Sequence, residues 1–171
     1  MMARAWIGLA AMLACGSAQA QAASPCVTSA EAEALVLFVA PDLIRQTGLR
    51  CQAVLPSSAL VRQASGPLLA KYEAETERAW PRVRSALAKL VGEQGAGLLD
   101  SSLAQPLVGS LVAPMLVGTL KPGDCATVER AVGLVQALPP RNVAALVVLF
   151  ARADASSASP RMRLPLCAEA R

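Results

Sequence analysis

The chain has 171 residues, of which 54% are hydrophobic, 16% charged and 3% aromatic. This length suits one hydrophobic core, and this composition excludes a disordered chain. There is no histidine, which excludes imidazole-based metal sites and nucleophiles that depend on an imidazole base. The formal net charge of +4 and the few aromatic side chains are not typical of nucleic-acid binding, so we expect no nucleic-acid partner.

The N-terminus has the pattern of a secretory signal peptide. Arg4 precedes an uncharged apolar run from Ala5 to Ala14, and Ala18-Gln19-Ala20 forms a small-x-small cleavage site. The apolar run is too short to span a membrane. We therefore expect residues 1–20 to be a signal peptide and residues 21–171 to form a single helical domain that is periplasmic or secreted.

Two alternatives remain for this N-terminal segment. Ala20-Gln21-Ala22 offers a second cleavage site of the same pattern. Cys15 lies after Leu13-Ala14 and before a glycine, which is similar to a lipoprotein box, although the leucine is displaced by one position. If Cys15 carries a lipid, the mature protein is anchored to a membrane.

The first predicted helix begins after Thr28, which has Glu31 three residues later in the spacing of a capping box. We expect it to end near Ala40. Pro41 can open a second, short helix at its first position, with Gly48 as its stop. A third short helix is predicted over residues 59–63, after a turn.

The clearest periodicity runs from Pro67 to Val91 and predicts one long amphipathic helix. Pro81 lies inside it and predicts a kink, whereas the glycines from Gly92 to Gly97 predict a helix stop and a loop. The apolar stripe of this helix consists of Leu69, Tyr72, Thr76, Trp80, Val83, Leu87 and Leu90.

Residues 101–120 contain no charged side chain. Their prolines, glycines and hydroxyl groups make a membrane span the weaker interpretation, and we expect no transmembrane span in the mature chain. We predict a central helix that its neighbours cover. A further alternative is an apolar groove for a hydrophobic ligand or partner.

The C-terminal part begins with a turn at residues 121–124. Asp124 is predicted to cap a helix that extends from Cys125 to Leu138, and Asn142 is predicted to cap a helix over residues 143–151. A loop over residues 155–160 follows. Residues 164–167 are predicted to form an extended tail that a disulfide holds.

The cysteine count favours two disulfides in the mature chain. Removal of Cys15 leaves Cys26, Cys51, Cys125 and Cys167, and an even number in an oxidising compartment indicates bridges rather than a metal site. The chain has no close C-x-x-C pair, so we expect no metal and no redox-active pair. Three pairings are open, of which we favour Cys26 with Cys51 and Cys125 with Cys167, because each would close a helical hairpin.

Most acidic residues have a simple structural interpretation. Glu31, Asp42 and Asp124 suit helix starts, and Glu73, Glu75 and Glu77 suit a solvated face that pairs with Lys71 and Arg78. No spacing selects a catalytic pair, and we expect no cofactor. Arginines around Trp80 and near the C-terminus are expected mainly at a solvated surface, with an anionic envelope surface as the alternative partner; they are Arg78, Arg82, Arg84, Arg152, Arg161, Arg163 and Arg171.

We therefore predict an all-α fold, a single compact helical bundle of about five to seven helices with a kinked long helix and two disulfides. The favoured function is a non-enzymatic exported protein that binds a protein or an envelope component. One alternative is a carrier of a hydrophobic small molecule, with a cavity between residues 103–120 and the stripe from Leu69 to Leu90. Another is a cell-wall hydrolase that uses two carboxylates without histidine.

Overall fold

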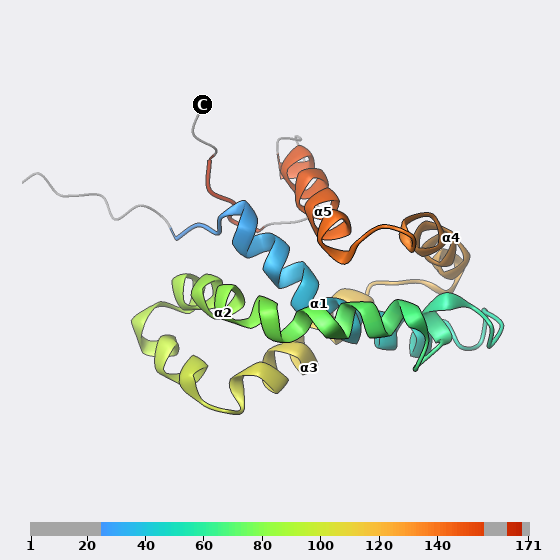
Figure 1. Cartoon of the computed structure of the whole chain (residues 1–171), viewed down its shortest axis with the longest axis horizontal. Helices are drawn as coiled ribbons and strands as arrows, with labels where there is room; N and C mark the ends of the chain where they lie inside the picture. Colours follow the sequence, from blue (N-terminus) through green and yellow to red (C-terminus); the bar gives the residue numbers. More distant parts are fainter. Residues whose placement is uncertain (1–24, 156–163, 169–171) are drawn as a thin grey trace, which may run out of the picture.

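The structure is a computed structural model that describes residues 25–155 and 164–168 (Figure 1). The predictions for residues 1–20, Cys15, Arg161, Arg163 and Arg171 fall outside these residues, as does most of the predicted 155–160 loop. The described residues form five α-helices, which confirms the predicted compact all-α fold. They are α1 (Ser29–Arg50), α2 (Pro67–Ala96), α3 (Ala104–Val117), α4 (Cys125–Val135) and α5 (Pro140–Ala155), and three 3₁₀ helices are η1 (Leu60–Arg62), η2 (Gly97–Asp100) and η3 (Pro122–Asp124).

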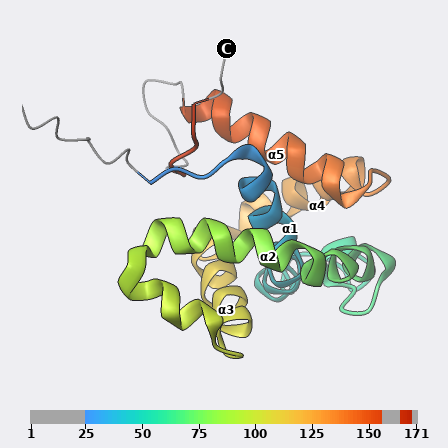
Figure 2. The ribbon, with the colours of Figure 1, turned by 60° about the vertical axis from the view of Figure 1, so that its left-hand side comes forward.

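Helix α1 lies at the centre of the fold. It packs against α2, α3 and α5, and Figure 2 shows α4 and α5 on one side of it and α2 and α3 on the other. Glu31 near the start of α1 contacts Lys89 of α2, whereas Arg45 near the end contacts Glu73, so α1 and α2 run antiparallel. Because neighbours surround α1, it buries the consecutive residues 37–41 instead of a single stripe.

Helix α1 begins as predicted but does not end as predicted. Thr28 and Glu31 form the expected capping box. The helix continues through Pro41 to Arg50, so the prediction of an end near Ala40 and a second helix from Pro41 is wrong. The hydrogen bond that a proline removes is offset here by the burial of Pro41 together with the four residues before it.

Gly48 was expected to stop a helix, but the structure shows that a glycine is needed here for close packing. A Cβ atom at this position would lie 2.3 Å from the carbonyl oxygen of Val61. Only glycine therefore lets the last turns of α1 approach η1. The predicted third helix over residues 59–63 corresponds to η1, which is a single 3₁₀ turn.

Helix α2 follows the predicted amphipathic pattern. Leu69, Tyr72 and Val83 of the stripe are buried, and Trp80 stacks near Phe38 of α1 with a ring-centroid distance of 5.2 Å. The hydroxyl of Thr76 donates a 3.5 Å hydrogen bond to the carbonyl of Tyr72, one turn back. The chain passes through Pro81 within the helix, and the residue of α2 with non-helical dihedrals is Gly92, at φ 68°. The helical kink therefore lies at Gly92, where the stop was predicted.

The four cysteines form two disulfides as predicted, but the favoured pairing is wrong. Cys26 pairs with Cys167, and Cys51 pairs with Cys125. The favoured pairing needed a turn at Pro41; because α1 is continuous, its 22 residues separate Cys26 from Cys51 by about 33 Å. The observed bridges join residues 141 and 74 positions apart, and chain entropy assigns them about 5 and about 4 kcal/mol.

The C-terminal helices and the tail complete the fold. Helix α5 confirms the helix predicted around residues 143–151, and it begins at Pro140, two residues before the expected cap. Asp124 accepts the backbone N–H of Lys121 at 3.0 Å and does not cap α4, contrary to the prediction. The tail is extended as predicted: Val27 forms a parallel β-bridge with Leu166, beside the Cys26–Cys167 disulfide.

Candidate binding surface

Glu31 is the buried charged residue in the described part of the chain. Its carboxylate accepts hydrogen bonds from the N–H and hydroxyl of Thr28, from the hydroxyl of Ser85 and from the ammonium of Lys89. Burial by itself raises the pKa of Glu31, but the hydrogen bonds from Lys89, Thr28 and Ser85 outweigh it and lower the pKa from 4.5 to about 2. Glu31 therefore stays charged and holds α1 against α2.

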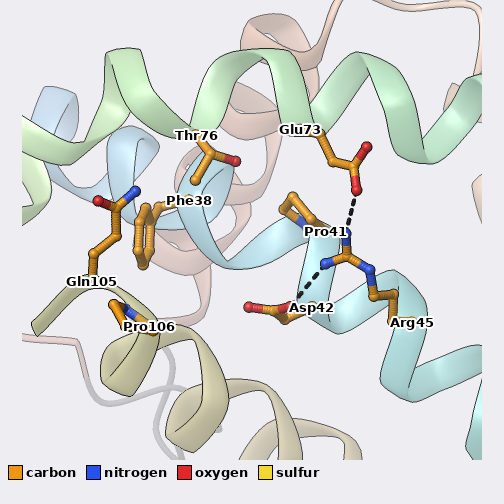
Figure 3. A pocket seen from close by; sticks show the side chains of 8 residues that line it. All are labelled: Phe38, Pro41, Asp42, Arg45, Glu73, Thr76, Gln105 and Pro106. Atoms are coloured by element: carbon orange, nitrogen blue, oxygen red, sulfur yellow. Dashed lines mark hydrogen bonds and ion pairs between the residues drawn. The ribbon is translucent and has the colours of Figure 1, made fainter. Parts of the chain in front are cut away.

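Figure 3 shows a groove of about 320 Å³ that is lined by residues of α1, α2 and α3 and opens broadly to solvent. Arg45 spans it, with one guanidinium nitrogen 3.0 Å from Asp42 and another bound to Glu73. Gln105 and Pro106 of α3 form the opposite wall in the same view. The remaining lining residues are Phe38, Pro41 and Thr76.

This groove is where the two alternative functions would have their sites. Asp42 and Glu73 do converge there, but both bind the guanidinium of Arg45 between them. A carboxylate-based hydrolase needs two carboxyl groups that can reach a substrate, whereas these two are bonded to the same arginine. A carrier needs an enclosed apolar cavity, whereas this groove is open and holds an ion pair.

The predicted acidic face of α2 is observed, and its carboxylates are paired. Glu75 binds Arg78 at 3.2 Å and Arg141 of α5 at 3.1 Å. Glu77 accepts a 2.9 Å hydrogen bond from the side chain of Gln105. Lys71 does not pair with a carboxylate as predicted but binds the carbonyl groups of Gln136 and Leu138 beyond the end of α4.

The described arginines do not form one basic patch around Trp80. Arg78 pairs with Glu75, and Arg84 pairs with Asp100 of η2 at 2.9 Å. Arg152 donates hydrogen bonds to the hydroxyl of Ser29 and to the carbonyl of Cys167, so it fastens the tail to α1 and α5. The arginines described here thus have structural roles at exposed ion pairs and at the tail.

Helix α3 buries small side chains and exposes large apolar ones. The residues that it buries are Ala104, Gly109, Ala113 and Val117. A row of four large residues, spaced by four positions, lies on the exposed side; we call it the α3 ridge. It consists of Leu103, Leu107, Leu111 and Met115, with exposed fractions of 65, 53, 62 and 76%. The prediction that neighbours cover residues 101–120 is therefore wrong.

A second exposed row of α3 contains only small or compact residues; we call it the small row. It consists of Pro106, Ser110, Pro114 and Gly118. The hydroxyl of Ser110 donates to the carbonyl of Leu107 at 3.1 Å, so its hydrogen bond is made within the helix. The ridge and the small row run parallel along the i, i+4 direction. Neither row contains a charged side chain.

The position of α3 depends on two glycines. Gly92 reverses the direction of the chain at the end of the regular part of α2, with φ 68° and no atom within 4 Å of an added Cβ. Gly109 is packed so closely against α1 that an added Cβ would lie 2.4 Å from a carboxylate oxygen of Asp42. At the other end, Arg50 donates a 3.2 Å hydrogen bond to the carbonyl of Leu120.

Large exposed apolar side chains also occur on the opposite side of α1. Leu134 of α4 is 79% exposed, and Leu149 and Phe150 of α5 are 60% and 69% exposed. The charged residues of α5 lie near its two ends, at Arg141, Arg152 and Asp154, so the uncharged stretch between them is limited to residues 142–151. The α3 ridge is the longer uncharged row.

The sequence singled out residues 101–120 but not the ridge within them. The ridge has a sequence signal, namely large apolar residues at four consecutive i+4 positions. A second row, from Ala104 and Val108 to Val112, Leu116 and Leu120, has the same spacing, so spacing alone does not identify the exposed row. Large apolar residues such as Leu107 and Leu111 are expected in the core, whereas the residues that α3 buries include Gly109 and Ala113.

The described residues contain neither a membrane-spanning helix nor a cluster of metal ligands. None of their helices combines the length and apolar character needed to cross a bilayer. No three His, Cys, Asp or Glu side chains among them lie together as metal ligands would. Comparison of the chain with known protein families, with curated proteins and with solved structures finds no match.

Proposed function

We propose that this protein is an exported binding protein without catalytic activity, and that its α3 ridge binds the apolar surface of another protein. The observation that carries the proposal is the 53–76% exposure of the four ridge side chains. Monomeric soluble proteins rarely expose contiguous apolar patches larger than a few hundred Å², and patches above that size mark interaction sites. Burial of the ridge by a partner would therefore lower the free energy of the complex.

Export is supported by the N-terminus and by the cysteines. Residues 1–20 have the pattern of a signal peptide. The Cys26–Cys167 and Cys51–Cys125 disulfides are of a kind that forms and persists in oxidising compartments. These two observations together support a periplasmic or secreted location.

The absence of catalysis in this proposal rests on how the carboxylates are used. Glu31 is held by four donors between α1 and α2. Asp42 and Glu73 share Arg45, and Glu75 binds two arginines. Each of these carboxylates takes part in ion pairs or hydrogen bonds that stabilise the fold, which supports a structural role for them rather than a catalytic one.

A protein fits the ridge better than a lipid headgroup or a small molecule does. Residues 101–120 have no cation, the two charged residues next before them, Asp100 and Glu93, are acidic, and Lys121 directly follows them. A single lysine is far fewer than the cluster of about four to eight basic residues that binds anionic headgroups. Small-molecule sites are concave, whereas the ridge is the outer face of a helix. Helix faces with apolar residues at i, i+4 spacing are a common recognition surface between proteins.

Site-specific photo-crosslinking in cells that naturally produce the protein tests this function. A photoreactive amino acid replaces Leu111 in the full chain, and the matched control carries it at Ala74, which is exposed on the polar side of α2. We expect the Leu111 probe to form an adduct with one defined protein, identified by mass spectrometry, and the Ala74 probe to form none. Leu107→Ser in the Leu111-probe chain should weaken this adduct.

Two results would contradict the function. The first is an adduct with lipid alone, which would make α3 a membrane-contact helix. The second is the absence of any adduct, or the same set of proteins at both positions, which would show that the ridge has no specific protein partner.

A further inference from the structure

We infer that the protein which binds the α3 ridge is a second copy of this chain, with the two α3 helices crossing antiparallel about a twofold axis. This inference rests on the proposed function, since it names the partner of the same surface. In a twofold dimer the same patch of both subunits meets, so the patch must complement itself. The shape, charge and area of α3 meet this requirement.

The shape of α3 is self-complementary because a row of large residues lies next to a row of small ones. The ridge from Leu103 to Met115 spans about 18 Å of the helix. The adjacent small row from Pro106 to Gly118 is exposed over the same turns. When two helices pack through their i, i+4 rows, the ridge of each enters the groove beside the ridge of the other, with a crossing angle of about −50°.

The antiparallel arrangement matches residues of suitable size. The middle of the ridge lies between Leu107 and Leu111, so a twofold axis at this point places Leu107 of one copy near Leu111 of the other. Ser110 lies beside this axis, and its hydroxyl is already bonded to the carbonyl of Leu107. Burial of the contact therefore leaves no side-chain donor of Ser110 without a partner.

The charge distribution also favours a second copy. Residues 101–120 carry no charge, so two identical faces meet without repulsion and without burying an ion. A partner with a charged face would have to leave its charges unpaired against the ridge. Antiparallel crossing further places the positive N-terminal end of one α3 dipole near the negative C-terminal end of the other.

The available area is close to what a dimer needs. From the exposed fractions of their residues, the ridge and the small row together expose on the order of 600 Å² per protomer, against roughly 800 Å² per partner in an interface of standard size. The size predicts a dimer that dissociates on dilution.

Sedimentation equilibrium of the purified, oxidised mature chain, from micromolar to millimolar concentration, tests the inference. We expect a monomer–dimer equilibrium. Leu111→Ser should raise the dissociation constant about tenfold or more, because each dimer loses two buried leucines. Ser110→Arg should also abolish the dimer, because it fills the small row and places two like charges beside the axis.

The matched control is Leu149→Ser on α5, since Leu149 is 60% exposed and Leu111 is 62% exposed. It should leave the dissociation constant unchanged. Circular dichroism and intact disulfides in all three variants exclude misfolding as the cause of a lost dimer. Ser110→Arg provides a second check, because its substitution removes no apolar group.

Several outcomes would overturn the inference. They are a wild-type chain that is monomeric throughout, a dimer that Leu149→Ser dissociates, or a Leu111-dependent chain that floats with phosphatidylcholine–phosphatidylglycerol vesicles instead of dimerising. The cellular crosslink separates this failure from failure of the function. An adduct between Leu111 and a different protein keeps the proposed function and removes the second copy, whereas an adduct with lipid alone removes both.

Discussion

Helices α2 and α3 both pack against α1, yet they present opposite kinds of side chain to it. Helix α2 buries Leu69, Tyr72 and Val83 and exposes charged residues, whereas α3 buries Gly109 and Ala113 and exposes leucines. This contrast shows that a large apolar residue in a helix does not always lie in the core. Close helix contact through small residues leaves the large ones free for another partner.

Removal of a disulfide is expected to change stability most, and the Cys51–Cys125 bridge closes the loop that contains both α2 and α3. Cys51→Ala with Cys125→Ala removes the bridge between the end of α1 and the start of α4, and we expect the free energy of unfolding to fall by about 4 kcal/mol in urea titrations. Because α3 connects to α4 just before Cys125, hydrogen exchange should increase more in α3 than in α2.

The control for this variant removes the other bridge. Cys26→Ala with Cys167→Ala should loosen the tail and the start of α1 but leave exchange in α3 close to that of the wild type. Equal acceleration in α2 and α3 by both double variants would show that α3 has no separate dependence on the Cys51–Cys125 bridge.

The same substitution in the two helices tests the contrast directly. Leu69 is 2% exposed and Leu111 is 62% exposed. Leu69→Ala should lower the free energy of unfolding by about 3 kcal/mol, through lost burial and a cavity. Leu111→Ala should change it by less than about 0.5 kcal/mol when measured at concentrations where the chain is monomeric. Similar losses at both sites would mean that the monomer itself covers the α3 ridge.

A change in pH is expected to affect the contacts of α2 more than those of α3, with a smaller loss of stability than in the disulfide and Leu69 variants above. The pKa of Glu31 is about 2 in the folded chain against 4.5 ordinarily, so the folded state binds its proton less readily than the unfolded state does. The stabilisation is therefore complete above about pH 4.5 and is lost as the pH falls towards 2. The stabilisation is on the order of 2–3 kcal/mol. This is less than the full pKa shift would give, because water screens the partly exposed Lys89.

Urea titrations between pH 6 and pH 2 measure this effect, with Glu31→Gln reducing the pH dependence and Glu33→Gln, on the same helix turn, as the control. Hydrogen exchange at low pH should increase where α2 contacts the start of α1, while residues 101–120 have no group that titrates. An unchanged slope in Glu31→Gln would contradict the assignment of the acid sensitivity to Glu31.

Features that depend on neighbouring residues were predictable. The Thr28–Glu31 capping box and the long amphipathic helix from Pro67 follow from local hydrogen bonds and 3.6-residue periodicity. Gly92 interrupts this helix at a positive φ, but the predicted stop and loop are wrong, because residues 93–96 continue the helix after the kink. Pro41 shows the limit of such reasoning. Its local effect predicts a helix end, but the helix is continuous and Pro41 is buried where α1 packs against its neighbours.

The candidate surface was predictable only in outline. An uncharged segment at residues 101–120 was evident, together with the alternative that it forms an apolar binding surface. Its exposed side was not evident, because Gly109 and Leu111 are equally compatible with either face of an uncharged helix. The inward face is the one that carries Gly109 and Ala113, where α3 packs against α1 and Gly109 lies close to Asp42, and this contact joins two segments far apart in the chain.

Composition and local spacing alone indicate that this protein is helical, that Cys26, Cys51, Cys125 and Cys167 are available to form disulfides, and where the first helix begins. Only the tertiary structure decided which cysteines pair, that α1 passes through Pro41, and that α3 turns its leucines outward. These features depend on contacts between residues up to 141 positions apart, and such contacts follow from the packing of whole helices rather than from any local pattern.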